Sequence, residues 1–161
     1  MTIKVGDKLP SVTLRQVTPE GPKEITTEEF FRGKKVALFA VPGAFTPACS
    51  QRHLPGYVDK AGDIKAKGVD EVACVAVNDP AVMTAWGKDQ KTEGKVAMLA
   101  DGSGDFVRAL GLELDLTKAG LGIRSKRYSM LVDNGVVKSL NIEQQPGQVD
   151  VSGAEAMLRA L

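Results

Sequence analysis

The sequence is poor in the residues that build disulfide frameworks, metal sites and highly charged surfaces. Its 161 residues include two cysteines and one histidine, too few for a disulfide scaffold and without the spacing of a zinc site. The 21 basic side chains balance 20 acidic ones, and no long run of one sign appears. This balance argues against nucleic acid or an anionic membrane as a partner and favours small molecules or proteins. No cluster of His, Asp or Glu indicates a metal or an organic cofactor.

The chain also lacks a long hydrophobic run. Its most apolar stretch, 36–45, contains Pro42 and Gly43 and is much shorter than the roughly 20 residues that a membrane-spanning helix needs. Segment 1–10 is too polar and broken to be the apolar core of a secretory signal. We therefore expect a cytoplasmic protein, although a removed organellar presequence would leave no trace. The length is typical of one domain, here 1–161.

Apolar runs alternate with helical patterns along the chain. The runs 36–41 and 71–77 predict strands that are buried on both faces, and the short distance between them indicates a right-handed βαβ crossover. Pro55 and Gly56 should kink or interrupt the helix of that crossover. The next helix is expected to start near Pro80 with Asp79 as its cap.

The second half predicts a hairpin between two further helices. Segment 95–100 is a candidate strand, followed by a turn and a short helix. Asn134-Gly135 supplies the positive φ angles of a tight turn, so the flanking segments 128–132 and 136–140 should pair. A C-terminal helix is expected to begin near 150–152. The pattern indicates an α/β fold with a mixed sheet and helices on both faces.

Segment 41–50 places a cysteine at the start of a helix. Thr46 suits the N-cap and Pro47 suits the first helical position, so Cys49 falls at the third. Free N–H groups and the helix dipole there favour the thiolate, which is the nucleophilic form of cysteine. A cysteine after an apolar strand is as often ordinary core, but the Thr-Pro start favours reactivity. The Thr46 hydroxyl is expected to bond both the Cys49 amide and its sulfur.

These residues resemble the peroxiredoxin signature, in which a proline, a Thr or Ser and the peroxide-reducing Cys recur at the spacing of Pro42, Thr46 and Cys49. Segments 75–80 and 126–130 are similar to the atypical group that holds the peroxiredoxin-5 type and the plant type II enzymes. The resemblance implies a thioredoxin fold with an N-terminal extension and a homodimer. It also implies reduction of hydrogen peroxide and alkyl hydroperoxides through a sulfenic acid. An external thiol (glutathione, glutaredoxin or thioredoxin) would then serve as reductant, with no cofactor.

The resemblance also assigns roles around the sulfur. The family's proline shields the sulfur from water, its Thr orients the peroxide, and an Arg stands on the strand that contains Arg127. Peroxide reduction builds negative charge on the departing oxygen, which a guanidinium can stabilise. Strand alternation sends Arg127 and Lys126 to opposite faces, so only one of them can face the pocket. Arg124 is closer to the preceding loop and is the weaker candidate.

The sequence leaves two roles open for Cys74. It lies within an apolar strand, where a buried small hydrophobe is the simpler interpretation, yet related plant enzymes have a cysteine in this strand. Some members of the group have a resolving cysteine near the C-terminus, but 141–161 contains none. A bond between Cys49 and Cys74 would need Cα atoms within about 7 Å, and we expect the first helical turn to unwind before they can meet.

Two other functions have to be weighed. His53 lies four residues after Cys49 and could share its helical face, as in a Cys-His hydrolase, although such enzymes usually take the base from elsewhere in the fold. A redox-sensing binding module on a thioredoxin scaffold is the non-enzymatic alternative. The segment from Thr46 to Cys49 has Thr where a thioredoxin C-x-x-C motif has its first Cys, which excludes a dithiol exchanger.

Overall fold

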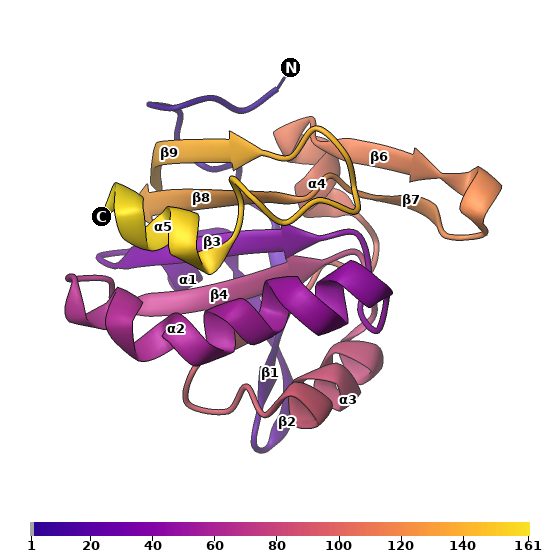
Figure 1. Cartoon of the computed structure of the whole chain (residues 1–161), viewed down its shortest axis with the longest axis horizontal. Helices are drawn as coiled ribbons and strands as arrows, with labels where there is room; N and C mark the ends of the chain where they lie inside the picture. The colour runs from indigo at the N-terminus through magenta and orange to yellow at the C-terminus, as the bar shows by residue number, and fades with distance from the viewer. Residues whose placement is uncertain (1) are drawn as a thin grey trace.

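A computed structural model describes residues 2–161, which form a seven-stranded mixed sheet flanked by helices (Figure 1). The strand order is β2-β1-β5-β4-β3-β8-β9, and β6 and β7 form a separate two-stranded sheet. The strands are β1 (Thr13–Thr18), β2 (Gly21–Thr26), β3 (Lys35–Val41), β4 (Glu71–Ala76), β5 (Ala97–Ala100), β6 (Glu113–Leu116), β7 (Gly122–Ser125), β8 (Tyr128–Asp133) and β9 (Val136–Ile142).

The centre of the sheet is parallel and its flanks are antiparallel. β3 pairs in parallel with β4, and β4 with β5, whereas β8 and β1 add antiparallel strands outside them. The predicted strands at 36–41 and 71–77 are confirmed, and 36–41 is entirely buried. Because β3 and β4 are parallel, the chain has to cross over between them through a helix. Cys49 lies in this connection, after the end of β3.

Helices cover both faces of the sheet, as predicted. One core lies under α2, α3 and α5, and the other lies under α1 and α4. Strand alternation divides the side chains between the two cores, so that Phe39 and Cys74 belong to the first and Leu38 and Ala73 to the second. The helices are α1 (Thr27–Phe31), η1 (Cys49–His53), α2 (Leu54–Ala66), α3 (Pro80–Gln90), α4 (Asp105–Leu110), η2 (Thr117–Ala119) and α5 (Ala154–Ala160).

Several local predictions are confirmed and one boundary is wrong. The Asp79 side chain accepts the Val82 N–H at 2.8 Å and caps α3. Asn134 and Gly135 have φ angles of 48° and 82° in the turn between β8 and β9. The C-terminal helix begins at Ala154 rather than near 150–152, because the Asp150 and Ser152 amides donate to the Glu143 carboxylate instead of entering a helix.

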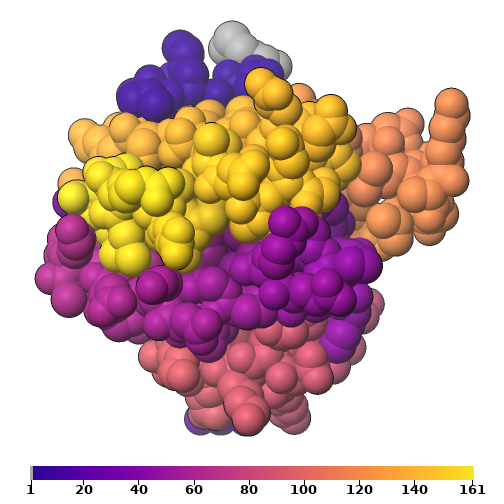
Figure 2. Space-filling view, in the orientation of Figure 1, coloured from indigo at the N-terminus to yellow at the C-terminus, as the bar shows by residue number. Residues whose placement is uncertain are grey.

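Two hairpins were not expected from the sequence. The β1–β2 hairpin pairs Thr13–Thr18 with Gly21–Thr26 and extends the sheet beyond β5. The β6–β7 hairpin projects from the body of the molecule as an arm (Figures 1 and 2). Within residues 2–161, no helix combines the length and the apolar character needed to cross a membrane.

Candidate active site

Cys49 lies in a widened turn at the start of a continuous helix. The helix begins at Pro47, takes a π-helical turn over η1, and continues as α2. The Leu54 N–H donates to the Cys49 carbonyl, five residues back. The helix is therefore not broken at Pro55, and the irregularity predicted there takes the form of the widened turn just before it. In a regular helix the ring of Pro55 would crowd the carbonyl four residues earlier, and the widened turn accommodates this conflict without a break.

Thr46 stands just before the helix, but its side chain bonds elsewhere than predicted. Its carbonyl accepts the Ser50 N–H at 2.9 Å, as expected for a helix start. Its hydroxyl donates to the Gly43 carbonyl at 2.7 Å rather than bonding the amide or the sulfur of Cys49. Phe45 adopts a positive φ of 62° within a tight turn, in which the Thr46 N–H also donates to the Gly43 carbonyl at 3.4 Å. The predicted cap bond is wrong, although Thr46 keeps its position beside the first turn.

The Arg127 guanidinium lies against the Cys49 sulfur. Arg127 precedes β8 directly and is 2% exposed, and its Nη2 donates to Cys49 Sγ at 3.1 Å. Its Nε donates to the Pro146 carbonyl at 2.9 Å. Lys126 points to solvent. Only one of the two adjacent cations meets the cysteine, as strand alternation requires, and it is the arginine that the family resemblance favoured. A thiolate at Cys49 would have a full positive charge in contact.

Arg124 has a different environment. Its Nε and Nη1 donate to the carbonyls of Leu121 and Val77, at 2.8 and 3.1 Å. It packs so closely over Gly43 that a Cβ atom there would lie 3.1 Å from Arg124 Nη1. Arg124 thus ties the β7 region to the loop before Cys49 and does not bond the sulfur.

His53 is fully buried and connects Arg127 to the C-terminal loop. Its Nδ1 lies 2.8 Å from Arg127 Nη1, and its Nε2 lies 2.9 Å from the Ser152 carbonyl. A guanidinium can only donate, so Nδ1 accepts and Nε2 has the proton that is donated to Ser152. Burial, followed by the charge of Arg127, lowers the His53 pKa to about 3, and the bond to Ser152 opposes this shift. The imidazole is therefore neutral.

This environment does not support a Cys-His hydrolase. Both ring nitrogens of His53 are occupied, and neither bonds Cys49. The sequence indicated His53 only as a partner of Cys49 and gave no sign of its contact with Arg127. The available signal was a lone histidine one helical turn after the cysteine.

The neutral state of His53 predicts a loss of stability in acid. The unfolded chain binds a proton there below about pH 6.5, whereas the folded protein does so only near 3. In that window the unfolded state binds more protons, so stability falls as the pH falls, by about 1.4 kcal/mol per unit. The measured quantity is the loss of unfolding free energy between neutral pH and about pH 5. This loss should be about 2 kcal/mol smaller in His53→Gln than in the wild type, because glutamine does not titrate. Equal drops in denaturant titrations would contradict this.

Two other segments support the turn around Cys49. The Asn78 side chain accepts the Ala44 N–H at 2.9 Å, and the Trp86 indole donates to the Ser50 hydroxyl at 3.0 Å. Asn78 belongs to segment 75–80, which is similar to peroxiredoxins, and Trp86 lies six residues beyond that segment in α3; the sequence indicated no role for either. They fix the loop before the cysteine and the residue after it.

Pro42 and Cys74 lie close to this site in the fold. Pro42 is buried directly after β3, in the loop that leads to Cys49. Cys74 is opposite Phe39 in the parallel β3–β4 register and faces the same core as Cys49. Both thiols are free and buried. Burial, and then the nearby Cys49, raise the pKa of the Cys74 thiol well above its usual range, while Arg127 lowers it.

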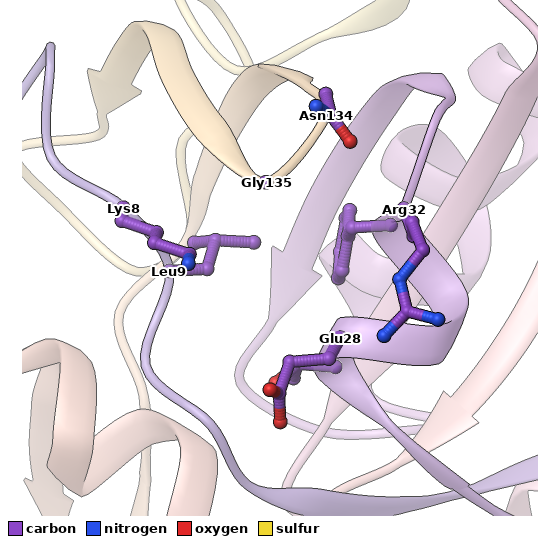
Figure 3. Close-up of a pocket in the computed structure, with 8 residues that line it drawn as sticks. Lys8, Leu9, Glu28, Arg32, Asn134 and Gly135 are labelled. Atoms are coloured by element: carbon purple, nitrogen blue, oxygen red, sulfur yellow. The ribbon is translucent and has the colours of Figure 1, made fainter.

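Two surface cavities lie away from Cys49. Figure 3 shows a cavity of about 310 Å³ beside α1 and the β8–β9 turn, lined in part by Lys8, Glu28 and Arg32. A broader groove of about 650 Å³ runs between α2 and the C-terminal segment that includes α5. Neither includes Cys49, whose side chain is fully buried. Among residues 2–161 no group of three or more His, Cys, Asp or Glu could hold a metal ion.

A buried thiol beside a guanidinium, at the start of the helix that follows β3 in a mixed sheet, is the arrangement of a thiol-dependent oxidoreductase. The Redoxin family model matches residues 4–158. Peroxiredoxin-2E, chloroplastic, from Arabidopsis thaliana is 52% identical, with 99% of this chain and 70% of that protein covered. Reduced Prx3 from Vibrio vulnificus in complex with H2O2 is 53% identical, with a TM-score of 0.93 and 99% of each chain covered.

Peroxiredoxin 5 from Alvinella pompejana is 41% identical, with a TM-score of 0.86, covering 98% of this chain and 97% of that one. The chain therefore belongs to the peroxiredoxin family, in its type II, peroxiredoxin-5-like group, and is a thiol peroxidase with a thioredoxin-like fold. The prediction of an α/β thioredoxin fold and of a peroxidase is confirmed, and the non-enzymatic alternative is wrong.

Proposed function

We propose that Cys49 is the residue that reduces the peroxide. Its thiolate attacks the terminal oxygen of hydrogen peroxide or an alkyl hydroperoxide, so that an S–O bond forms as the O–O bond breaks. The cysteine is oxidised to a sulfenic acid, and the departing oxygen takes a proton and leaves as water or an alcohol. The observation that carries this proposal is the 3.1 Å contact between Arg127 Nη2 and Cys49 Sγ.

The surrounding residues then have separate tasks. Arg127 stabilises the thiolate and the negative charge that develops on the leaving oxygen. Thr46 donates its hydroxyl proton to Gly43, which leaves its oxygen lone pairs to accept a hydrogen bond from the peroxide. Pro42 has no N–H and is buried in the loop that leads to Cys49, so it supports a dry pocket wall around the sulfur.

An external thiol completes the cycle without a cofactor. Glutathione would displace water from the sulfenic acid to form a mixed disulfide, which a second glutathione, a glutaredoxin or a thioredoxin reduces to free Cys49. The test is a steady-state assay of hydrogen peroxide and alkyl hydroperoxide consumption with each reducing system in turn. We expect turnover with at least one of them. No consumption beyond one equivalent with any reductant would refute the cycle.

Cys74→Ser should keep most of the wild-type turnover with glutathione and glutaredoxin. Cys74 is fully buried in mid-strand, and the environment that raises its pKa keeps it a neutral thiol, so it is a poor nucleophile in the folded protein. After one equivalent of peroxide, mass spectrometry should find Cys49 chiefly as sulfenic acid or as a glutathione adduct. A Cys49–Cys74 linked peptide as the main product, with turnover lost in Cys74→Ser, would establish a two-cysteine mechanism instead.

A homodimer is also part of the proposal. Phe45, in the loop before Cys49, is 52% exposed, and Ile123 on the β7 arm is 48% exposed. Large apolar side chains exposed on this loop and on the β7 arm support a contact there. Sedimentation at micromolar concentration should give twice the monomer mass, and a monomer would contradict the prediction.

A cytoplasmic location remains a prediction, which cell fractionation tests.

A further inference from the structure

We propose that His53 is a positioning residue for the peroxide-reducing step, and that it holds the Arg127 guanidinium against the Cys49 sulfur. The proposal rests on the proposed function of Cys49 and Arg127. Neither ring nitrogen of His53 bonds the sulfur. Its effect on the reaction is transmitted through Arg127.

The guanidinium is held on three sides. Nε donates to the Pro146 carbonyl at 2.9 Å, Nη1 to His53 Nδ1 at 2.8 Å, and Nη2 to Cys49 Sγ at 3.1 Å. The first two anchors fix the plane and the direction of the fork, so the third N–H group can only point at the sulfur. Without His53, Arg127 would rotate about its remaining bond to Pro146.

Both of these anchors are neutral acceptors. Each ion pair found within residues 2–161 is formed by a lysine or arginine other than Arg127, although Arg127 is 2% exposed. A carboxylate in place of His53 would orient the guanidinium equally well but would compensate its charge. A neutral imidazole orients it and leaves the positive charge for the thiolate and the leaving oxygen.

The C-terminal loop fixes which nitrogen of His53 accepts. The Ser152 carbonyl accepts from His53 Nε2 at 2.9 Å, which leaves Nδ1 as the acceptor for Arg127. The Glu143 carboxylate holds this carbonyl in place by accepting the Ser152 N–H and hydroxyl at 2.8 and 2.6 Å. The ring of Phe39, 4.8 Å from the imidazole, limits rotation of His53. The loop 143–152 thereby determines the direction of the Arg127 side chain.

The test compares two replacements of His53 with a matched control. His53→Leu removes the acceptor, whereas His53→Gln keeps one acceptor and one donor in a neutral side chain. Tyr57→Phe is the control, because the Tyr57 hydroxyl donates to the same Ser152 carbonyl at 2.8 Å without reaching Arg127. Two properties are measured: the second-order rate constant with hydrogen peroxide, and the pH midpoint of Cys49 alkylation by iodoacetamide, followed on its own peptide by mass spectrometry.

We expect His53→Leu to lower the rate constant roughly 10- to 100-fold, as a misplaced catalytic group does, and to raise the alkylation midpoint. His53→Gln should stay within about threefold of the wild type. Tyr57→Phe should lose stability but keep both properties. A wild-type rate and midpoint in His53→Leu, or the same losses in His53→Leu and His53→Gln, would overturn the proposal.

A measurement on the wild-type protein covers the case in which His53→Leu does not fold. Nitrogen NMR of the imidazole should show the Nε2–H tautomer throughout the range in which the enzyme is active, and the other tautomer or a protonated ring would overturn the proposal. Failure of the proposed function is distinguishable. In that case Cys49→Ser would retain peroxidase turnover, whatever the tautomer of His53 and whatever its variants do to Cys49 alkylation.

Discussion

Replacing Cys49 by serine is expected to lower peroxide turnover by roughly 10⁴-fold or more, since loss of the nucleophile in a covalent mechanism leaves little but background reaction. Serine has nearly the same size, and the site is fully buried, so the fold should survive. The serine hydroxyl does not ionise in the accessible pH range, and contact with Arg127 cannot make it a thiolate equivalent.

The measurement is peroxide consumption with each reductant, accompanied by circular dichroism to establish that the variant is folded. Cys74→Ser is the matched control, because it makes the same change at the other buried cysteine of the same core. Folded Cys49→Ser with more than trace activity would remove Cys49 from the mechanism. Loss of activity in both variants would instead show that the core does not tolerate serine or that Cys74 also takes part.

The centre of the fold was predictable because its information is local. An unbroken apolar run such as 36–41 can bury both of its faces only as an inner strand of a sheet that is covered by helices on both sides. Asn134-Gly135 specifies its tight turn by its own residue types. The β1–β2 hairpin was not predictable in the same way. Its strands are half-exposed and polar, with Pro22 in β2, and their position is decided by pairing with β5, more than 70 residues away.

In the candidate site, too, the features that depend on neighbouring residues were predictable and the others were not. The position of Cys49 in the first turn follows from the residues that start the helix, and the meeting of Cys49 with Arg127 was expected from family resemblance and strand alternation. The predicted hydrogen bond of Thr46 was wrong because the hydroxyl bonds Gly43 within a tight turn. That turn includes the positive φ of Phe45, which no side-chain pattern in the sequence indicates.

The role of His53 could not be predicted because its partners are remote. Arg127 is 74 residues away and Ser152 is 99 residues away. Glu143 and Ser152 sit in an irregular loop, where neither helical nor strand periodicity indicates which groups are buried. A buried histidine among neutral and cationic partners is visible only once the chain is folded.

Arg127→Gln is expected to lower the second-order rate constant for hydrogen peroxide by about 10²- to 10³-fold at neutral pH, the usual cost of losing a donor to developing negative charge. Glutamine is shorter and uncharged, so it removes the positive charge from the sulfur and leaves His53 Nδ1 without its 2.8 Å partner. Arg124→Gln is the matched control, since Arg124 lies over the loop before Cys49 but donates only to backbone carbonyls. It should keep the wild-type rate.

The pH dependence separates the two tasks assigned to Arg127. Losing a cation beside the sulfur disfavours the thiolate, so the midpoint of Cys49 alkylation should move to higher pH in Arg127→Gln. Above that midpoint the thiolate is restored, and this part of the rate deficit should disappear. The deficit that persists measures stabilisation of the leaving oxygen alone. If the rate constant returns fully to the wild-type value at high pH, Arg127 acts only on the thiolate. If both rate and midpoint match the wild type throughout, the contact with Cys49 has no part in catalysis.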